Sequence, residues 1–507
     1  MPVRIGEPMT LDDVVAAARG EPVELSPAAA ERMAASRAVV EDKVARSETV
    51  YGVTTGIGSL ANVRISPEQA ERLQLDIVRS HATAVGPPLS ETETRAMLAL
   101  RAHVLALGRS GVRPVVVERM VEMLNRRVVP VVPERGSLGA SGDLAPLAHL
   151  ALPLVGLGEV WVDGRPTAVA GSVPGFPEPL QLGAKEGLAL VNGTQGMLAV
   201  GGLALQRAER ALRAADVAAA MSVEALLGTD VPFDERLQRL RPHPGQAASA
   251  SNLRRLLAGS PILASHRDSP HLVQDAYSLR CAPQVHGAAR GAASWCRAVL
   301  ETEIGSVSDN PVVLAEDGSV LSGGNFHGQP VAVALDAAAL ALVGAASIAE
   351  RRLYRLLDPA LSNGLPPFLV GESGLNSGFM LVQYTAASLV SEAKTLAHPA
   401  SVDSIPSSAG QEDHVSMGMT AARHLRSVVE IAETVVGLEA LAAAQGIDLR
   451  RPLRPAAGTA AAHAAVRTAV PFLDSDREVR HDIDGAVGGV RDGRLVGAAE
   501  DAVGPLA

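Results

Sequence analysis

The stretch Arg135-Gly136-Ser137-Leu138-Gly139-Ala140-Ser141-Gly142-Asp143-Leu144 contains a tripeptide that is able to modify itself. In Ala140-Ser141-Gly142, the amide nitrogen of Gly142 can attack the carbonyl carbon of Ala140 and close a five-membered ring. Glycine suits the attacking position because it has no Cβ to obstruct a close backbone approach. Loss of water from the ring and from the Ser141 side chain would leave a methylidene imidazolone, a strong electrophile. Taken alone, so small a tripeptide more often forms an ordinary turn before a helix.

The residues after the tripeptide predict a helix that holds the loop in place. Asp143 stands where an N-cap is expected, and Pro146 is tolerated only in the first turn of a helix. Leu144, Leu147 and Leu150 recur near helical spacing, so one face of this helix is expected to lie in a core. The positive end of the helix would stabilise negative charge that develops on a ring oxygen.

The composition favours packed helices and a small-molecule partner. Of 507 residues, 47% are hydrophobic but only 2% are aromatic, so Leu, Val and Ala must fill the core. The formal net charge is -10, which leaves no basic footprint for nucleic acid or for an anionic membrane. We therefore expect neither nucleic acid nor membrane as a partner.

The cysteines and the N-terminus indicate a cytoplasmic protein without a metal. Cys281 and Cys296 are the only cysteines, too few for a disulfide framework and without zinc-type spacing. The first seven residues lack the apolar run of a signal peptide. The most apolar run, residues 331–349, contains Asp336 and is interpreted as a buried bundle helix rather than a membrane span.

Hydrophobic periodicity divides the chain into two regions. Short helices, a small hairpin near residues 159–164 and Gly-rich loops predict a loop-rich N-terminal domain over residues 1–195, which includes Tyr51 and the tripeptide. Residues 196–507 are expected to form a bundle of long antiparallel helices. The charged, Gly-rich tail from Arg477 onward is expected to be poorly ordered. The predicted helices cover residues 11–18, 27–46, 90–107, 113–127, 196–227, 329–357, 379–396 and 415–445.

Several other chemistries do not fit the sequence. Ser141 is not in a Gly-x-Ser-x-Gly elbow, because position 143 is Asp. None of the three lysines follows a glycine, so a P-loop is absent. The run Gln411-Glu412-Asp413-His414, if helical, would point its side chains in different directions and would not surround one metal ion.

Ordered blocks along the chain resemble the aromatic amino acid ammonia-lyases, the family of histidine, phenylalanine and tyrosine ammonia-lyases and related aminomutases. The tripeptide alone is weak evidence, but many blocks in the same order are strong evidence. The resemblance extends from Tyr51 to about Gly418. The blocks are residues 51–56, 80–82, 136–148, 186–195, 274–281, 308–311, 324–328 and 411–418.

The resemblance implies a fold and a set of roles. It implies an ammonia-lyase/fumarase-like helical fold, a homotetramer with shared active sites, and no cofactor other than the methylidene imidazolone formed from Ala140, Ser141 and Gly142. The substrate amine adds to this ring, which takes up electrons as the carbon-nitrogen bond breaks. Further residues matched by the resemblance are Tyr51 as general base, Arg280 as carboxylate clamp, Asn192 and Tyr277 as hydrogen-bonding groups, and Gln274 and Phe326 around the same pocket.

Two residues indicate which amino acid is bound. His81 and Glu412 match positions that are typically His and Glu in the histidine-specific members. An imidazole and a carboxylate can hydrogen-bond the two nitrogens of a substrate imidazole, and such a site rejects analogues that lack them. The resemblance therefore implies conversion of L-histidine to urocanate and ammonia.

Three alternatives remain open. Ile57, Thr54, Ala84 and Gly410 differ from the residues common in the histidine-specific members, and residues 281–284 resemble the tyrosine enzymes equally well. A phenol-binding lyase also uses His near position 81, so a tyrosine ammonia-lyase is one alternative. A tyrosine 2,3-aminomutase is the second. The third is a catalytically inactive helical scaffold.

Overall fold

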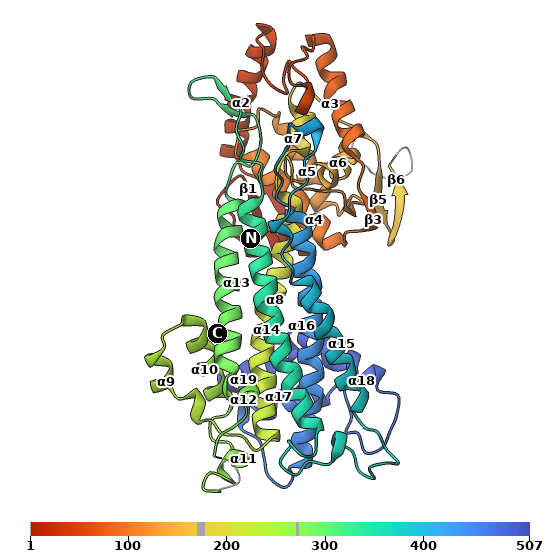
Figure 1. The fold of residues 1–507 in the computed structure, drawn as a ribbon. Coiled ribbons are helices and arrows are strands. Elements are labelled where there is room, and N and C mark those ends of the chain that lie inside the picture. Colours follow the sequence, from red (N-terminus) through yellow and green to blue (C-terminus); the bar gives the residue numbers. More distant parts are fainter. Residues whose placement is uncertain (1, 170–177, 270–272) are drawn as a thin grey trace. The chain divides into compact units, whose positions relative to one another are not determined.

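The computed structural model describes residues 2–169, 178–269 and 273–507 and is mostly helical, as the sequence predicts (Figure 1). The chain forms two compact units that alternate along the sequence. Unit 1 consists of Met1–Leu203, Arg297–Leu335 and Pro399–Arg423. Unit 2 consists of Ala204–Cys296, Asp336–His398 and His424–Ala507. Each unit is therefore assembled from three separate segments of the chain. The single domain boundary expected at residue 195 stays a prediction.

Short helices and two-stranded sheets build unit 1. A capping box opens α4 (Glu91–Ala106), in which the Ser90 and Glu93 side chains each bond the other residue's backbone N–H. Helix α4 packs on α1 and α5, and α3, α6 and α7 pack on one another. The helices are α1 (Leu11–Arg19), α2 (Pro27–Ala45), α3 (Pro67–His81), α4 (Glu91–Ala106), α5 (Pro114–Asn125), α6 (Leu144–Ala151) and α7 (Glu186–Val191).

The sheets of unit 1 are small, and each contains only two strands. The hairpin predicted near residues 159–164 is formed by β5 and β6, which pair antiparallel. Residues 170–177, which follow this hairpin in the sequence, lie outside the described residues. The pairs are β1 (Val3–Ile5) with β2 (Val23–Leu25), β3 (Val85–Pro88) with β4 (Pro133–Arg135), β5 (Glu159–Val162) with β6 (Arg165–Ala168), and β7 (Val312–Leu314) with β8 (Ser319–Leu321).

Long helices supply the core of unit 2. Helices α8 (Gln195–Ala225), α13 (Ala282–Ile304), α14 (Gln329–Leu357) and α16 (Gly418–Leu449) each contribute residues to both units. Within unit 2, buried Ala, Val and Leu side chains of α8, α14, α15 (Met380–Leu396) and α16 form one apolar core. The remaining helices of this unit are α9 (Glu235–Leu240), α10 (Pro244–Leu256), α11 (Pro261–Ala264), α12 (Tyr277–Arg280), α17 (Ala457–Arg467), α18 (Arg480–Arg491) and α19 (Arg494–Val503).

Helix α14 contains the apolar run at residues 331–349. Among the described helices it alone is long and apolar enough to cross a membrane, but 56% of its most apolar window is buried inside the protein. Its residues Leu353 and Leu356 belong to the unit 2 core. Core helices of globular proteins pass the same length and composition test, so the helix gives little support for a membrane span.

The C-terminal tail is ordered, and the prediction of a poorly ordered cap is wrong. Helix α18 buries Ala486, Val487 and Val490, and α19 buries Leu495 and Val496. These apolar residues recur at helical spacing between the charged and glycine positions that dominated the composition. Helix α19 packs on α17, so the tail completes unit 2.

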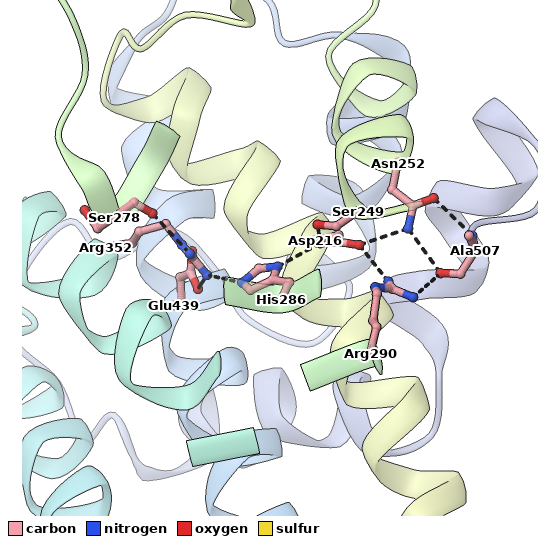
Figure 2. Close-up of polar contacts among 9 residues, drawn as sticks. All are labelled: Asp216, Ser249, Asn252, Ser278, His286, Arg290, Arg352, Glu439 and Ala507. Atoms are coloured by element: carbon pink, nitrogen blue, oxygen red, sulfur yellow. Dashed lines mark hydrogen bonds and ion pairs between the residues drawn. The ribbon is translucent and has the colours of Figure 1, made fainter. Parts of the chain in front are cut away.

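A buried polar network joins α8, α10, α13 and the last residue of unit 2 (Figure 2). The Asp216 carboxylate on α8 accepts hydrogen bonds from Ser249, Asn252, His286 and Arg290. Burial alone would raise the pKa of Asp216, but Arg290 and His286 outweigh it and hold the pKa at about 2. A carboxylate with so many donors is strongly stabilised in the folded state.

A second buried ion pair lies beside this network. Arg352 on α14 donates two hydrogen bonds to the Glu439 carboxylate on α16, at 2.5 and 2.8 Å. Ser222 on α8 donates to the same carboxylate at 2.7 Å. These bonds fix the three long helices in one register, because an unpaired buried charge is costly.

We predict that Asp216→Asn lowers the free energy of unfolding by about 3 kcal/mol, since it leaves Arg290 without its buried anion. Urea denaturation followed by circular dichroism measures the change. Asp484→Asn is the control, because Asp484 forms only an exposed pair with Arg480 and should change stability by less than about 1 kcal/mol. Equal losses in the two variants would contradict the structural role of Asp216.

Candidate active site

The tripeptide loop packs against the turn between α7 and α8. Gly142 is buried and has a φ of 77°, a conformation that favours glycine. The next amide, Asp143 N, donates to the Gly193 carbonyl oxygen at 2.7 Å. A Cβ on Gly142 would lie 2.1 Å from that oxygen. Only glycine therefore fits at the third position of the tripeptide.

The residues before α16 hold the other side of the loop. Met417 N donates to the Leu138 carbonyl oxygen at 2.9 Å. Gly139 has a φ of 71°, and a Cβ there would lie 2.1 Å from Ser416 Oγ. The loop is thus enclosed by two segments distant in sequence, and its backbone conformation is constrained on both sides.

Asp143 plays a different part from the predicted helix cap. It precedes α6 at the expected position, but its side chain makes no capping hydrogen bond to that helix. The carboxylate instead accepts from Ser137 Oγ at 2.7 Å and from Met197 N, in the first turn of α8, at 2.8 Å. Burial raises the pKa of Asp143 to about 6, since these donors are uncharged and no cation compensates for lost solvation.

His81 and Glu412 line one cavity together with the tripeptide. The cavity has a volume of about 230 Å³, and its lining includes Ala140 and Gly142. Ser141 Oγ donates to Glu412 Oε1 at 3.3 Å, and Ser407 Oγ donates to Glu412 Oε2 at 2.8 Å. Glu412 lies in a loop before α16, so the helical arrangement considered for residues 411–414 is wrong. The other lining residues are Ser80, Thr83, Gly136, Ser137, Leu138, Leu144, Ala145 and Ser407.

The backbone of α3 determines which nitrogen of His81 carries a proton. His81 Nδ1 lies 2.8 Å from the Ile77 carbonyl oxygen, which can only accept. The Nδ1 atom therefore bears a hydrogen, and in the neutral tautomer this leaves Nε2 as the acceptor. Both side chains predicted to select the substrate thus offer acceptors.

Tyr51 lies outside the residues that line this cavity. Its phenolic oxygen accepts a hydrogen bond from Gly58 N at 3.0 Å. The next amide, Ser59 N, donates to Ser408 Oγ at 3.3 Å, beside the Ser407 that binds Glu412. The Tyr51 loop and the Glu412 loop are therefore in direct contact.

Asn192 and Phe326 also belong to unit 1 but lie outside the cavity lining. Asn192 ends α7 and is 2% exposed. Its Nδ2 donates to Asp309 Oδ1 and to the Asn310 carbonyl oxygen, at 3.1 and 3.0 Å. Phe326 is half-buried in the loop before α14.

The other three predicted site residues belong to unit 2. Gln274 and Arg280 line a cavity of about 620 Å³ within that unit. Tyr277 is 70% exposed, and the Arg280 guanidinium stacks 4.6 Å from the centre of its ring. None of the three is among the residues that line the cavity beside the tripeptide.

Comparison with known proteins identifies the family of this chain. A family model described as aromatic amino acid lyase matches residues 9–468. The chain belongs to the aromatic amino acid lyase family. A histidine ammonia-lyase from Sorangium cellulosum (strain So ce56) is 55% identical over 99% of this chain and 99% of its own length.

Solved structures of this family share the whole fold. The crystal structure of histidine ammonia-lyase from Trypanosoma cruzi has a TM-score of 0.91 and 44% identity, covering 99% of this chain and 96% of that one. A tyrosine aminomutase from Streptomyces globisporus has a TM-score of 0.94 and 38% identity, covering all of both chains. The predicted family and fold class of this aromatic amino acid lyase are confirmed.

Sequence reasoning missed the groups that hold the site residues of this lyase. Ser407 binds Glu412, and Lys185 pairs with Asp309 behind Asn192 at 2.7 Å. Asp309 lies in one of the matching blocks, but no local pattern connects it to Lys185, 124 residues away. Among the described residues, no group of three or more His, Cys, Asp or Glu side chains is arranged to hold a metal ion.

We predict that Asp143→Asn flattens the pH dependence of stability between about pH 4 and 6. The folded-state pKa is about 6, above the ordinary 3.8, so the folded protein binds more protons and wild-type stability falls as pH rises through this window. This group accounts for about 3 kcal/mol of that fall. Melting temperatures at pH 4.5 and 7 measure it, with the exposed Asp413→Asn as control. An unchanged slope in Asp143→Asn would refute the raised pKa.

Proposed function

We propose that this chain eliminates ammonia from L-histidine and releases urocanate. The observation that supports this most directly is the cavity in which His81 and Glu412 lie beside Ala140 and Gly142. Membership of the aromatic amino acid lyases supports cleavage of a carbon-nitrogen bond. The high identity to histidine ammonia-lyases supports histidine as the substrate.

The residues of the loop fit an electrophile built from Ala140, Ser141 and Gly142. Gly142 has a positive φ and no side chain that would obstruct the approach of its nitrogen to the Ala140 carbonyl carbon. Once formed, the methylidene imidazolone supplies an electrophile for the substrate amine. Formation of the group consumes no external cofactor, since every atom comes from the chain.

His81 and Glu412 hold the imidazole side chain of the substrate. The Ser141 hydroxyl, which donates to Glu412 Oε1, is lost as water when the group forms. That carboxylate oxygen then accepts a hydrogen bond from an imidazole N–H. Ser407 keeps the other oxygen in place. His81 lines the same cavity and offers Nε2 as a second acceptor, an arrangement that suits a protonated substrate ring with two N–H groups.

The remaining roles involve more than one subunit of a homotetramer. Tyr51 takes the β-proton, and Arg280 binds the substrate carboxylate through its planar guanidinium. By the family resemblance, other copies of the chain contribute to each pocket, and Gln274, Tyr277 and Arg280, which lie in unit 2, belong to the same proposed site. Phe326 and Asn192 complete the pocket from unit 1. We expect this assembly to act in the cytoplasm.

Turnover of L-histidine tests the proposed activity. Incubation of the purified protein with L-histidine should produce the ultraviolet band of the conjugated urocanate side chain, together with free ammonia. L-tyrosine at the same concentration is the matched comparison. No absorbance change with histidine but a rising band with tyrosine would overturn the substrate assignment.

Tyrosine is the second candidate substrate, with lyase or 2,3-aminomutase chemistry. It is favoured by the resemblance to the tyrosine aminomutase fold and by His81 Nε2, which is able to accept from a phenol as well as from an imidazole. Chromatographic detection of β-tyrosine would support the aminomutase, and 4-coumarate would support the lyase.

Glu412→Gln tests the imidazole contact. We predict that it lowers kcat/KM for L-histidine by roughly 10- to 100-fold, because a hydrogen bond to a charged group is replaced by one to a neutral amide. Activity on tyrosine, measured in parallel, should fall much less. The exposed Glu118→Gln on α5 serves as control and should retain wild-type values. Equal losses on both substrates would count against Glu412 as the selector.

A further inference from the structure

Three ionisable side chains are buried behind Asn192. Arg101 and Lys185 are 0% exposed and Asp309 is 1% exposed. Lys185 Nζ donates to Asp309 Oδ2 at 2.7 Å, and Asn192 Nδ2 donates to Asp309 Oδ1 at 3.1 Å. The same nitrogen donates to the Asn310 carbonyl oxygen at 3.0 Å. Such charges are expensive to bury, and one of them, Asp309, contacts the Asn192 side chain directly.

The chemistry of these partners settles which way the Asn192 amide points. An ionised carboxylate and a backbone carbonyl are acceptors only, so both must face Nδ2. An amide nitrogen has two hydrogens, and both are used here. The atom that Asn192 has left for a ligand is Oδ1, which is an acceptor.

Lys185 and Arg101 keep Asp309 ionised, and this keeps the Asn192 amide from turning over. Burial alone would raise the pKa of Asp309, but Lys185 and Arg101 outweigh it and hold the pKa below its usual range. Asp309 therefore stays an anion and cannot donate to Asn192. Arg101 also binds the backbone at the end of α7, donating to the carbonyl oxygens of Asn192 and Ala189 and to Gln195 Oε1.

The fixed side chain is next to the tripeptide. Gly193 follows Asn192 directly, and its carbonyl oxygen accepts from Asp143 N and abuts Gly142. Any displacement of residues 192–193 would therefore also displace the tripeptide loop. A ligand amine that reaches the tripeptide comes close to this segment of backbone.

We propose that Lys185 and Asp309 are positioning residues that fix Asn192 as a hydrogen-bond acceptor for the substrate's ammonium group. Asn192 then makes no donor contact with the substrate carboxylate. This inference rests on the proposed function for the identity of the ligand, but the orientation of Asn192 does not depend on which amino acid is used. Recognition of the amine and recognition of the carboxylate are thereby assigned to different residues.

Two ligand fragments separate these contacts. Histamine carries the amine without a carboxylate, and 3-(imidazol-4-yl)propanoate carries the carboxylate without an amine. In Asp309→Asn the new amide is able to donate, so Asn192 is free to turn over. We expect the dissociation constant of histamine, measured by calorimetry, to rise about 10-fold or more, while that of the propanoate changes less than about 2-fold.

A second variant guards against misfolding from an unpaired lysine. Lys185→Met/Asp309→Asn removes both charges together and leaves no uncompensated cation at this pair. It should give the same selective loss of histamine binding. The exposed Asp317→Asn is the matched control and should change neither constant. Melting temperature and intact mass establish that each variant is folded and carries the same tripeptide chemistry as the wild type.

The outcomes distinguish this inference from the proposed function. A larger loss for the propanoate, equal losses for both fragments, or no loss in either variant would overturn the acceptor role. If the wild type does not release urocanate from histidine, the proposed substrate fails instead. The same measurement is then made with tyramine and 3-(4-hydroxyphenyl)propanoate, for which the selective loss of the amine fragment is again the expected result.

Discussion

The backbone contact between Gly142 and Gly193 is the constraint on which the candidate site depends. A carbonyl oxygen occupies the place where any side chain at position 142 would begin, and the following amide donates to that same oxygen. This contact couples the tripeptide to the end of α7 and to Asn192. On the opposite side, Met417 and Ser416 confine Leu138 and Gly139. The chain thus fixes the loop from two directions before any ligand is present.

The pKa values of three buried carboxylates differ because the groups that hydrogen-bond each carboxylate differ in charge. Asp143 receives only uncharged donors, and its pKa rises to about 6. Asp309 and Asp216 are equally buried, yet each faces cations and has a lowered pKa. Desolvation is common to all three, so the difference comes from the neighbouring charges. The anions with cationic partners fix the direction of neighbouring side chains, as Asp309 does for Asn192 and Asp216 for Asn252.

Local patterns predicted the helices and the tripeptide but not the contacts between distant segments. The hydrophobic periodicity of residues 329–357 and 90–107 was sufficient to predict α14 and α4. Resemblance placed His81 and Glu412 in one site, and both line the same cavity. The Asp143 side chain was misassigned as a cap because its partners in α8 are far away in the sequence. The prediction of a poorly ordered C-terminal tail was wrong because it relied on the charged, Gly-rich composition and not on the helical spacing of the few apolar residues.

The proposed reaction depends on the conversion of Ala140, Ser141 and Gly142 into the electrophile. Peptide mapping by mass spectrometry of the purified protein tests this most directly. The peptide that contains residues 140–142 should be lighter than its sequence mass by two water molecules, and Ser141→Ala should lack that deficit and lose activity. A wild-type peptide at its full sequence mass, in a preparation that releases urocanate from histidine, would contradict the account.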